Sequence, residues 1–231
     1  MNQIITLQIP YQYGEKSECI YPVVLLDNKE MILVDCGYTG FLPKIENALK
    51  EQGLSPTSLT KIVITHHDHD HMGDLAAFIE KYPLIKVVAS SIEAPIVSGE
   101  EKSLRLIQAE NAQENLPEEK KPLGLAFCEL LKSVLPSPVD IKVNDGDAFD
   151  WCGGCKIIAT PGHTPGHISL LLPGHNTIIT GDAAVIEAGK LVVANPGYAL
   201  NLSEAEKSLE ILLEFRGATY ICYHGGVYND L

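Results

Sequence analysis

The sequence predicts an α/β (α+β) fold in which a partly parallel β-sheet is covered by helices. Short runs of β-branched and aliphatic residues alternate with helical segments along most of the chain. One strand–helix–strand unit, residues 61–89, has the length of about 30 residues that a parallel crossover needs. With 231 residues, 45% of them hydrophobic and 20% charged, the chain has the size and composition of one large globular domain. We therefore expect a single domain over residues 1–231.

Three strands open the predicted domain, at residues 3–9, 20–26 and 31–34. The turn-forming residues Asp27-Asn28-Lys29 separate the last two strands, which predicts a hairpin. Apolar residues then recur at helical spacing from Leu42 to Leu49, and Gly53 marks the end of that helix.

The crossover unit begins with a buried strand at residues 61–65. The helix after it carries apolar side chains on one face from Leu75 to Tyr82, and Pro83 ends it. Residues 84–89 form the next strand. Two strands joined by a helix in this way are expected to be parallel.

Residues 91–135 interrupt the alternation. Helices are expected at residues 92–97, 104–115 and 123–135, with charges of both signs and no strand between them. Because strands resume on both sides, we interpret residues 91–135, here called the helical insertion, as a lid within the single domain. Its apolar side chains either form the core of the lid or contact an apolar substrate.

The C-terminal half returns to strands, at residues 140–143, 155–160, 167–172, 177–180 and 191–193. An amphipathic helix then buries Ala205, Leu209, Leu212 and Leu213. Ser203, followed three residues later by Glu206, fits the capping-box pattern at its N-terminus. A last strand, residues 219–222, leads directly into His224.

Charge and composition exclude several classes of partner. The formal net charge of −13, with no cluster of Lys and Arg, argues against nucleic acid. The N-terminus shows no basic segment followed by an apolar stretch, and no apolar run approaches the ~20 residues that span a bilayer. We expect a cytoplasmic protein that acts on a small molecule, without a membrane or nucleic-acid partner. The chain does not indicate an oligomeric state.

Six cysteines are scattered through the chain, and Cys152 and Cys155 form the one close pair. A structural zinc site would need a second such pair, which is missing. A turn between two strands is the preferred interpretation, and a redox pair is the alternative.

The segment after the strand at residues 61–65 is the most informative part of the sequence. Residues 65–74 read Thr-His-His-Asp-His-Asp-His-Met-Gly-Asp and hold half of the eight histidines. Imidazole and carboxylate groups are ligands that zinc, iron and manganese accept. A histidine-rich surface loop that chelates metal incidentally is the plain alternative.

Further residues of the same type follow other predicted strands, and loops at one edge of a sheet can converge on a site. The candidate metal ligands are His66, Asp68, Asp70, His71, His163, Asp182 and His224. Side chains alternate along an extended segment, so His66 and Asp68 are expected to point the same way. Gly73 permits a close backbone approach after them.

These motifs, taken in order, resemble the metallo-β-lactamase superfamily. The matching segments are residues 33–37 (Leu-Val-Asp-Cys-Gly), 65–73, 161–167 (Pro-Gly-His-Thr-Pro-Gly-His), 181–182 (Gly-Asp) and 223–226 (Tyr-His-Gly-Gly). The resemblance covers nearly the whole chain apart from the helical insertion. It implies a four-layer αβ/βα sandwich with a dinuclear metal site at the edge between two sheets.

The resemblance also implies an assignment of ligands. His66, Asp68 and His163 would hold one metal ion; Asp70, His71 and His224 would hold the other. Asp182 would bridge both. Asp68 stands where the family pattern has histidine, as in the di-iron branch of the superfamily. Two divalent ions are expected, with Zn²⁺ as the first choice. Fe or Mn are alternatives, because three carboxylates make the ligand set harder.

A competing register uses His67, His69 and His71, which also alternate. The order of the motif favours the first register. His167 is then expected to be a hydrogen-bonded histidine at a strand start, and His175 an exposed turn residue. Asp35 is a candidate for orienting a ligand imidazole.

The predicted function is a metal-dependent hydrolase of a small ester, lactone or thioester. Two cations roughly 3.5–4 Å apart could hold a hydroxide near neutral pH for attack on an acyl carbon. Asp70, the candidate catalytic residue, could accept a proton and pass it to the leaving group, or act as a ligand only. Tyr198 could polarise a carbonyl oxygen, although an ordinary packed tyrosine is the simpler interpretation.

Two alternatives are kept. Asp68 favours an iron-dependent oxidoreductase of the di-iron or sulfur dioxygenase type. A non-catalytic metal-binding sensor would bury the same ligands beneath its lid, and a water-accessible cleft beside them would argue against it.

Overall fold

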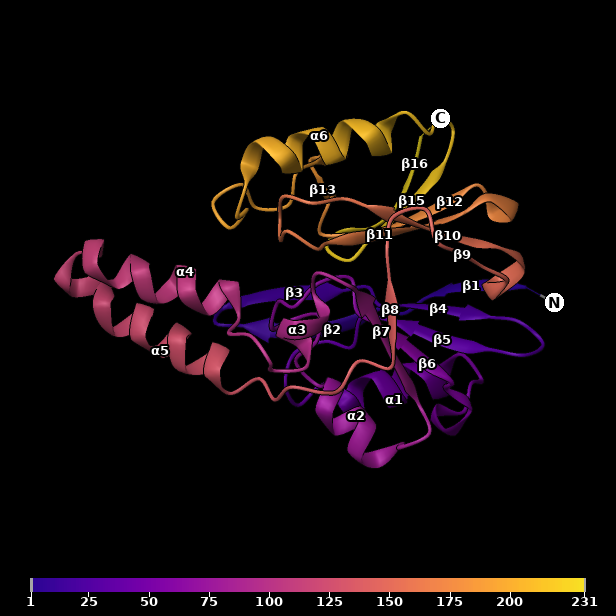
Figure 1. Ribbon diagram of the computed structural model, residues 1–231, viewed down its shortest axis with the longest axis horizontal. Coiled ribbons are helices and arrows are strands. Elements are labelled where there is room, and N and C mark those ends of the chain that lie inside the picture. Colours follow the sequence, from indigo (N-terminus) through magenta and orange to yellow (C-terminus); the bar gives the residue numbers. More distant parts are fainter. Residues whose placement is uncertain (1, 231) are drawn as a thin grey trace.

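Two six-stranded β-sheets face each other, and helices cover the outer face of each (Figure 1). The structure is a computed structural model that describes residues 2–230. Residues 1 and 231 of the predicted domain therefore lie outside the described residues. The arrangement of helix layer, sheet, sheet and helix layer is the predicted four-layer sandwich.

The first sheet has the order β1-β4-β5-β6-β7-β8. Its strands are β1 (Gln3–Thr6), β4 (Val23–Leu26), β5 (Met31–Val34), β6 (Lys61–Val63), β7 (Lys86–Ser90) and β8 (Ile141–Val143). The pairs from β5 to β8 are parallel, whereas β4 is antiparallel to β1 and to β5. The partly parallel sheet and the β4–β5 hairpin agree with the sequence prediction. Asp27 Oδ1 closes this hairpin by accepting hydrogen bonds from the backbone of Lys29 and Glu30.

The second sheet has the order β16-β15-β12-β11-β10-β9. Its strands are β9 (Ala148–Phe149), β10 (Cys155–Ala159), β11 (Ile168–Leu172), β12 (Thr177–Gly181), β15 (Thr219–Cys222) and β16 (Gly226–Asn229). Only the β12–β15 pair is parallel among the described strands of this sheet. The ends of β12 and β15 therefore lie at the same edge, where their following loops meet.

Two small hairpins complete the strands. They are β2 (Ile9–Tyr13) with β3 (Lys16–Ile20), and β13 (Val185–Glu187) with β14 (Lys190–Val192). The sequence prediction missed the first hairpin and also β9, β13 and β16. Tyr11 of β2 packs against the rings of Tyr38 and Phe41, a distant contact that local sequence patterns do not reveal.

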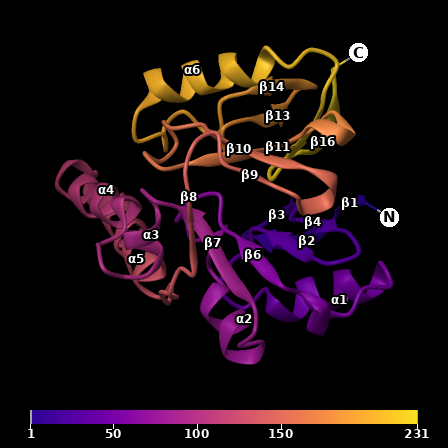
Figure 2. The same ribbon diagram turned by 45° about the vertical axis from the view of Figure 1, so that its right-hand side comes forward.

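Helices α1 and α2 cover the first sheet, and α6 covers the second (Figures 1 and 2). The helices are α1 (Leu42–Glu51), α2 (Leu75–Lys81), α3 (Ala94–Val97), α4 (Leu104–Ala112), α5 (Lys121–Lys132) and α6 (Leu202–Leu213). Short 3₁₀ turns are η1 (Pro56–Ser58), η2 (Gln113–Asn115), η3 (Glu118–Lys120), η4 (Trp151–Gly153) and η5 (Pro173–His175). None of the helices in the described part of the chain is long and apolar enough to cross a bilayer.

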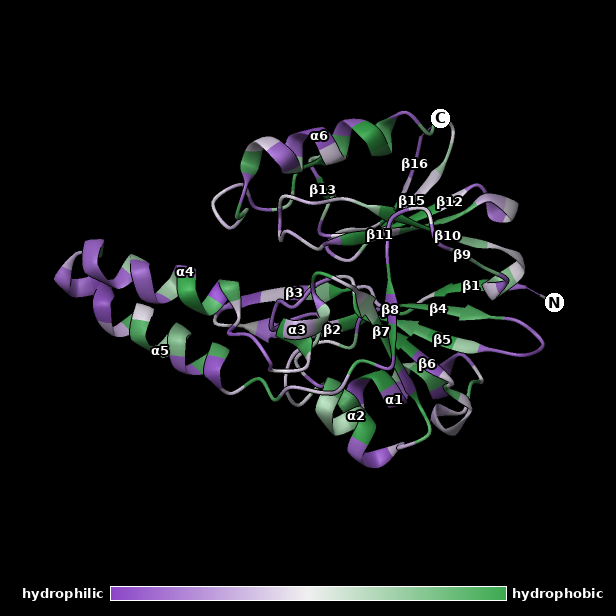
Figure 3. Ribbon diagram, in the orientation of Figure 1, coloured by the Kyte–Doolittle hydropathy of each residue, from purple (hydrophilic) through white to green (hydrophobic). Residues whose placement is uncertain are grey.

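Each pair of neighbouring layers has its own hydrophobic core. Val34, Val63 and Leu170 belong to the cluster between the two sheets. A second cluster joins the first sheet to α1 and α2, and a third, with Leu212, joins the second sheet to α6. Figure 3 shows the matching pattern, with hydrophobic strands such as β4 and β11 inside and polar residues on the outer helix surfaces.

The predicted cap of α6 is wrong. The helix begins at Leu202, and Asn201 is its N-cap, with Oδ1 accepting a hydrogen bond from the Glu204 backbone at 3.2 Å. Ser203 therefore lies inside the first turn. Asparagine caps as well as serine does, so the local sequence offered two competing starts.

The helical insertion packs α4 and α5 side by side, and this helical hairpin projects from the sandwich (Figures 1 and 2). Leu106, Ala109, Cys128 and Leu131 form its own core. Cys152 lies in η4, between β9 and β10, Cys155 begins β10, and both thiols are free. This agrees with a turn between strands.

Candidate metal centre

Four loops bring the predicted ligands to one edge of the sandwich. Residues 66–71 follow β6, and His163 lies between β10 and β11. Asp182 follows β12, and His224 follows β15, where it pairs with Ile20 through an isolated bridge. Because β6, β12 and β15 are rigidly held within sheets, the loops that leave them are positioned precisely enough to build a site.

The seven predicted residues come together in three overlapping groups. The groups are His66, Asp68 and His163; His66, His71 and Asp182; and Asp70, His71 and His224. Within each group, the candidate ligand atoms lie within 4.8 Å of one another. The first and third groups are the two sets that the sequence assigned to separate ions. Their role as ligands stays a prediction.

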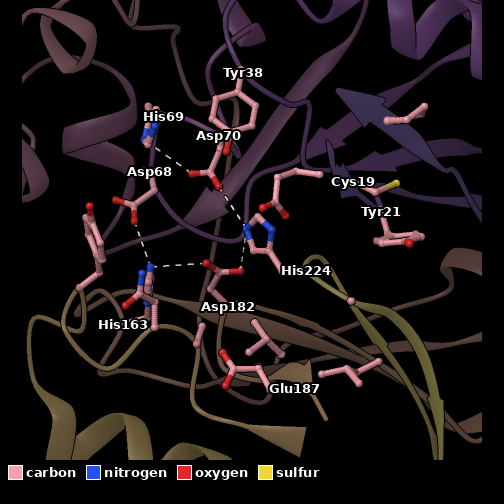
Figure 4. Close-up of a pocket in the computed structure, with 18 of the residues that line it drawn as sticks. Cys19, Tyr21, Tyr38, Asp68, His69, Asp70, His163, Asp182, Glu187 and His224 are labelled. Carbon is pink, nitrogen blue, oxygen red and sulfur yellow. Dashed lines mark hydrogen bonds and ion pairs between the residues drawn. The ribbon is translucent and has the colours of Figure 1, made fainter. Parts of the chain in front are cut away.

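Asp182 lies between the two sets, as the bridging assignment requires. Its Oδ2 is 3.6 Å from His163 Nε2, whereas its Oδ1 is 3.4 Å from His71 Nε2 and 3.7 Å from His224 Nε2. Figure 4 shows this carboxylate between the His163 and His224 rings. One oxygen is therefore directed to each set.

Asp35 fixes the orientation of two imidazoles. Its Oδ2 accepts hydrogen bonds from His71 Nδ1 at 2.8 Å and from the Thr65 hydroxyl at 2.8 Å. The Thr65 oxygen in turn is 3.1 Å from His66 Nδ1 and accepts its proton in that arrangement. Both rings are thereby held with Nε2 toward the site. The predicted contact of Asp35 with a ligand imidazole is present, but the connection through Thr65 was missed.

The competing register is not assembled. His67 turns away from the site, where its ring and its backbone N–H bond the buried carboxylate of Glu93. His69 packs edge-on against the rings of Tyr38 and Phe127. Glu93 also accepts hydrogen bonds from the Thr164 hydroxyl and the Gly166 backbone, so it ties the His66 loop to the His163 loop. The sequence prediction missed this role of Glu93.

Gly73 allows the loop to close as the sequence predicted. A Cβ added at this position would lie 2.2 Å from the carbonyl oxygen of His69 and 2.5 Å from the backbone nitrogen of Thr39. The loop is held from the other side by Tyr223, whose hydroxyl donates to the Asp70 carbonyl at 2.6 Å.

His167 supports Asp182 and is not part of any ligand group in residues 2–230. Its Nε2 accepts a hydrogen bond from the Asp182 backbone N–H at 2.9 Å, so its Nδ1 donates to Thr160 at 2.8 Å. Burial lowers the pKa of His167 well below its usual value, which suits this neutral role. The prediction of a hydrogen-bonded histidine beside a strand is confirmed. His175 is half-buried and its ring contacts Cys152, so the expectation of an exposed turn residue is wrong.

The charges around the site favour a cation. Burial opposes charge on His71, but Asp182, Asp35 and Asp70 raise its pKa well above the usual value. Burial would also raise the pKa of Asp68, but the hydrogen bond from His163 and the nearby His66 and Arg105 side chains lower it strongly. The carboxylates are therefore ionised, and the cluster attracts a proton or a metal ion.

Arg105, on α4, is a buried cation that the sequence prediction missed. It is 1% exposed and forms an ion pair with Asp68 at 2.8 Å. In the sequence it stands among the mixed charges of the helical insertion, and nothing separates it from the surface lysines nearby. Only the packing of α4 against the site reveals it.

A cavity of about 770 Å³ opens beside the cluster. Its wall includes the predicted ligands Asp68, Asp70, His163, Asp182 and His224. Phe127 of α5 and Arg105 of α4 also line it, so the helical insertion forms part of the wall. Tyr198 is 43% exposed on this wall, and its ring packs against Phe127 and the Arg105 guanidinium.

The residues fit a metal ion. His66 Nε2, His71 Nε2 and Asp182 Oδ1 are buried and form no hydrogen bond with any described protein atom. These three atoms belong to residues of one ligand group. Buried polar atoms without partners are costly, and two imidazoles with one carboxylate are suitable ligands for a divalent cation.

Comparison with known proteins agrees with the geometry. The family model of the metallo-beta-lactamase superfamily matches residues 18–224. A metallo-beta-lactamase family protein from Thermus thermophilus has a similar structure, with a TM-score of 0.75 and 24% identity over 98% of this chain and 75% of that chain.

Curated relatives have similarly low identity. The uncharacterized protein YobT of Bacillus subtilis is 27% identical over 89% of this chain and 84% of its own length. A hydroxyacylglutathione hydrolase of Ruegeria pomeroyi is 27% identical over 74% of this chain and 54% of its length. An N-acyl homoserine lactonase of Bacillus is 33% identical over 56% of this chain and 39% of its own length. The chain thus spans about half or less of the length of this hydrolase and this lactonase.

The ordered motifs, the four-layer sandwich and the family match lead to one conclusion: the chain belongs to the metallo-β-lactamase superfamily.

Proposed function

We propose that the protein is a metal-dependent hydrolase of a small ester, lactone or thioester, with two metal positions. The observation that carries the proposal is the placement of both ligand groups at the wall of an open cavity. The stated activities of the thioester- and lactone-hydrolysing relatives support the same reaction class. A sensor with a sealed centre has no use for such a cavity.

The site residues have distinct proposed roles, of which the first is to bind the cations. When bound, divalent cations lower the pKa of a coordinated water, so that a hydroxide nucleophile is available near neutral pH. His66 and His71, held by Thr65 and Asp35, would bind the cations through Nε2, and Asp182 would bridge them.

Asp70 is the proposed proton carrier. It lines the cavity, and its Oδ2 is 3.1 Å from His224 Nε2. Burial opposes ionisation, but His71, His224 and His69 lower the pKa of Asp70 below its usual value. It is therefore ionised near neutral pH and able to accept a proton from the nucleophile and deliver it to the leaving group.

The cavity wall is mixed, with the aromatic side chains of Tyr38, Phe127 and Tyr198 beside the charged cluster. This arrangement suits an acyl group with an apolar part, whose carbonyl faces the cluster. A cavity of about 770 Å³ is within the range of small-molecule sites.

The test begins with protein purified without added metal. Its metal content is measured, and the same sample is assayed on panels of esters, lactones and thioesters. Hydrolysis of at least one class that disappears on chelation and returns with metal is expected. A metal-loaded protein inert on all three panels would contradict the proposal.

Asp70→Asn separates the two roles of that residue. If Asp70 carries the proton as well as binding metal, the variant should lose roughly 10²–10⁴-fold in kcat even after it is reloaded to the metal content of the wild type. Activity that returns fully with the metal would instead assign Asp70 a ligand role only. Asp74→Asn is the matched control, because Asp74 lies in the same loop but bonds the backbone of Gly40 and Leu42.

An iron-dependent oxidoreductase is the second candidate, favoured by Asp68. Three carboxylates make the ligand set harder than a histidine-rich one and favour iron or manganese beside zinc. Iron in the purified protein together with dioxygen consumption would support this candidate, and zinc without redox activity would reject it.

A further inference from the structure

Arg105 is a buried cation that contacts two of the seven candidate ligands. Its Nε lies 3.0 Å from Asp68 Oδ1 and 3.1 Å from Asp68 Oδ2, and its Nη2 lies 2.8 Å from Asp68 Oδ2. The same Nη2 is 3.3 Å from His163 Nε2. Asp68 and His163 are two of the three residues in the first ligand set, with His66.

The guanidinium and a metal ion would need the same atoms. His163 Nε2 is 3.0 Å from Asp68 Oδ2 and faces Asp182. In one tautomer it carries a proton directed at Asp68; in the other its lone pair accepts the Nη2 hydrogen. In both cases the electron pair that would bind a metal is already used. A divalent ion at this position would also stand beside a fixed positive charge, which repels it.

The second ligand set also has an internal imidazole–carboxylate contact, between His224 Nε2 and Asp70 Oδ2 at 3.1 Å, but it differs from the first in its contacts with Arg105. The hydrogen bonds and ion pair of Arg105 within residues 2–230 do not extend to Asp70, His71 or His224. His71 Nε2 and Asp182 Oδ1 are without hydrogen bonds among the described residues. A metal ion can bind there without displacing a protein cation. The two positions are therefore unequal.

Arg105 also connects the helical insertion to the site. Its Nη1 donates to Gln108 Oε1 at 2.6 Å and to the backbone carbonyl of Tyr198. The side chain thus joins α4, the Asp68 loop and the loop at Tyr198, and all three nitrogens of its guanidinium are engaged. Withdrawing the guanidinium from Asp68 breaks their ion pair, and a shift of α4, which carries Arg105, would do this.

We propose that Arg105 competes with a metal ion for Asp68 and His163. The Asp70–His71–His224 set binds a metal ion first, and the His66–Asp68–His163 set binds one only when α4 withdraws the guanidinium. Metal binding at that set and release of α4 are then coupled, and by linkage each favours the other. Asp68 makes the competition effective, because a carboxylate can form an ion pair with arginine whereas a neutral imidazole cannot. The inference rests on the proposed metal centre and is independent of the substrate.

The main experiment is a titration of metal-free protein with Zn²⁺ against a competing chelator. For the wild-type chain we expect one tight ion and a second ion bound at least about tenfold more weakly. Arg105→Gln should tighten the second ion about tenfold or more and leave the first unchanged. Arg105→Lys, which keeps the charge, should stay closer to the wild type. Lys102→Gln removes an exposed charge that pairs with Glu110 and is the matched control.

A second experiment uses the unmodified chain, in case Arg105→Gln does not fold. Amide hydrogen exchange is followed in residues 104–112 as Zn²⁺ is added. Exchange should stay constant up to one equivalent and increase as the second ion binds. Protection by the first ion elsewhere does not affect this comparison, because residues 104–112 are measured alone.

The outcomes are distinguishable. Two ions of equal affinity in the wild-type chain, or two bound ions with unchanged exchange in residues 104–112, would overturn the competition while leaving a metal-dependent hydrolase intact. A chain that binds no Zn²⁺, Mn²⁺ or Fe²⁺ would overturn the metal centre and this inference together. Full metal binding without hydrolysis would contradict the proposed function only.

Discussion

Asp35 Oδ2 accepts a hydrogen bond from His71 Nδ1 at 2.8 Å, and this contact links the end of β5 to the loop after β6. The contact decides which ring nitrogen of His71 carries the proton. It leaves Nε2 unprotonated and directed at Asp182 in the form that binds a metal ion.

Asp35→Asn should weaken metal binding about 10- to 100-fold. The amide NH₂ of asparagine can donate to Nδ1 and so place the proton on Nε2, the intended ligand atom. Asp35 has a φ of 60°, a conformation that asparagine tolerates, so the backbone should not be strained. Competition with a chelator measures the effect. Asp140→Asn is the control, because Asp140 precedes β8 and bonds the backbone of Val87 in β7, and it should leave metal affinity unchanged. An equal loss of metal affinity in both variants would refute the orienting role.

Phe127→Ala should raise KM about fivefold without changing metal content, because the ring contributes apolar area to the cavity wall. The measurement is steady-state kinetics on the substrate that the panels identify. Leu125→Ala changes an exposed residue of the same helix and should have no effect. Identical kinetics for Phe127→Ala and the wild type would place the substrate away from α5.

Gly73→Ala should destabilise the protein by about 1–3 kcal/mol, because the new methyl group would meet the backbone of His69 and Thr39. Urea denaturation of the metal-free protein gives the value directly. Gly174→Ala is the matched control, since an added Cβ there has its nearest contact at 3.8 Å. A tolerated Gly73→Ala would show that the loop can move aside.

Metal binding should stabilise the folded chain. With free metal about 100-fold above Kd, the gain is about 2.7 kcal/mol, or roughly 5–10 °C in Tm for a chain of this size. His71→Ala should remove most of the shift, whereas His175→Ala, whose ring contacts Cys152 away from the site, should keep it. Thermal unfolding with and without chelator tests this. An equal shift in His71→Ala would exclude His71 as a ligand.

The Glu30–Lys61 ion pair should make stability depend on pH in the acid range. Burial raises the pKa of Glu30, but hydrogen bonds from Lys61 and Thr60 outweigh it and lower the pKa below the usual value. Such a carboxylate stabilises the fold above its unfolded pKa, about 4.3, and the contribution is lost as pH falls through the lower folded pKa. Glu30→Gln should therefore be about 1 kcal/mol less stable than the wild type at neutral pH, with the difference vanishing in acid. A difference that grows on acidification would have the wrong sign.

Local sequence predicts the elements whose signals are strong and short in range. The strand at Met31–Val34, the hairpin turn at Asp27 and the strand at Thr219–Cys222 follow from aliphatic runs and turn residues. The α6 start was misplaced because Asn201 and Ser203 are equivalent caps by sequence. The hairpin of β2 and β3 was missed because the aromatic residues that hold it lie some 30 residues away.

Residue types and their order along the chain were enough to establish the family and the seven clustered residues, because metal-ligand chemistry restricts both. The orientation of each ring, and the cation that stands beside Asp68, emerge only in the folded chain. Thr65, Glu93 and Arg105 act through contacts between segments 26 to 93 residues apart. A hydroxyl, a carboxylate and a guanidinium of this kind look like ordinary surface groups in a sequence, and only burial against one particular partner gives them a role.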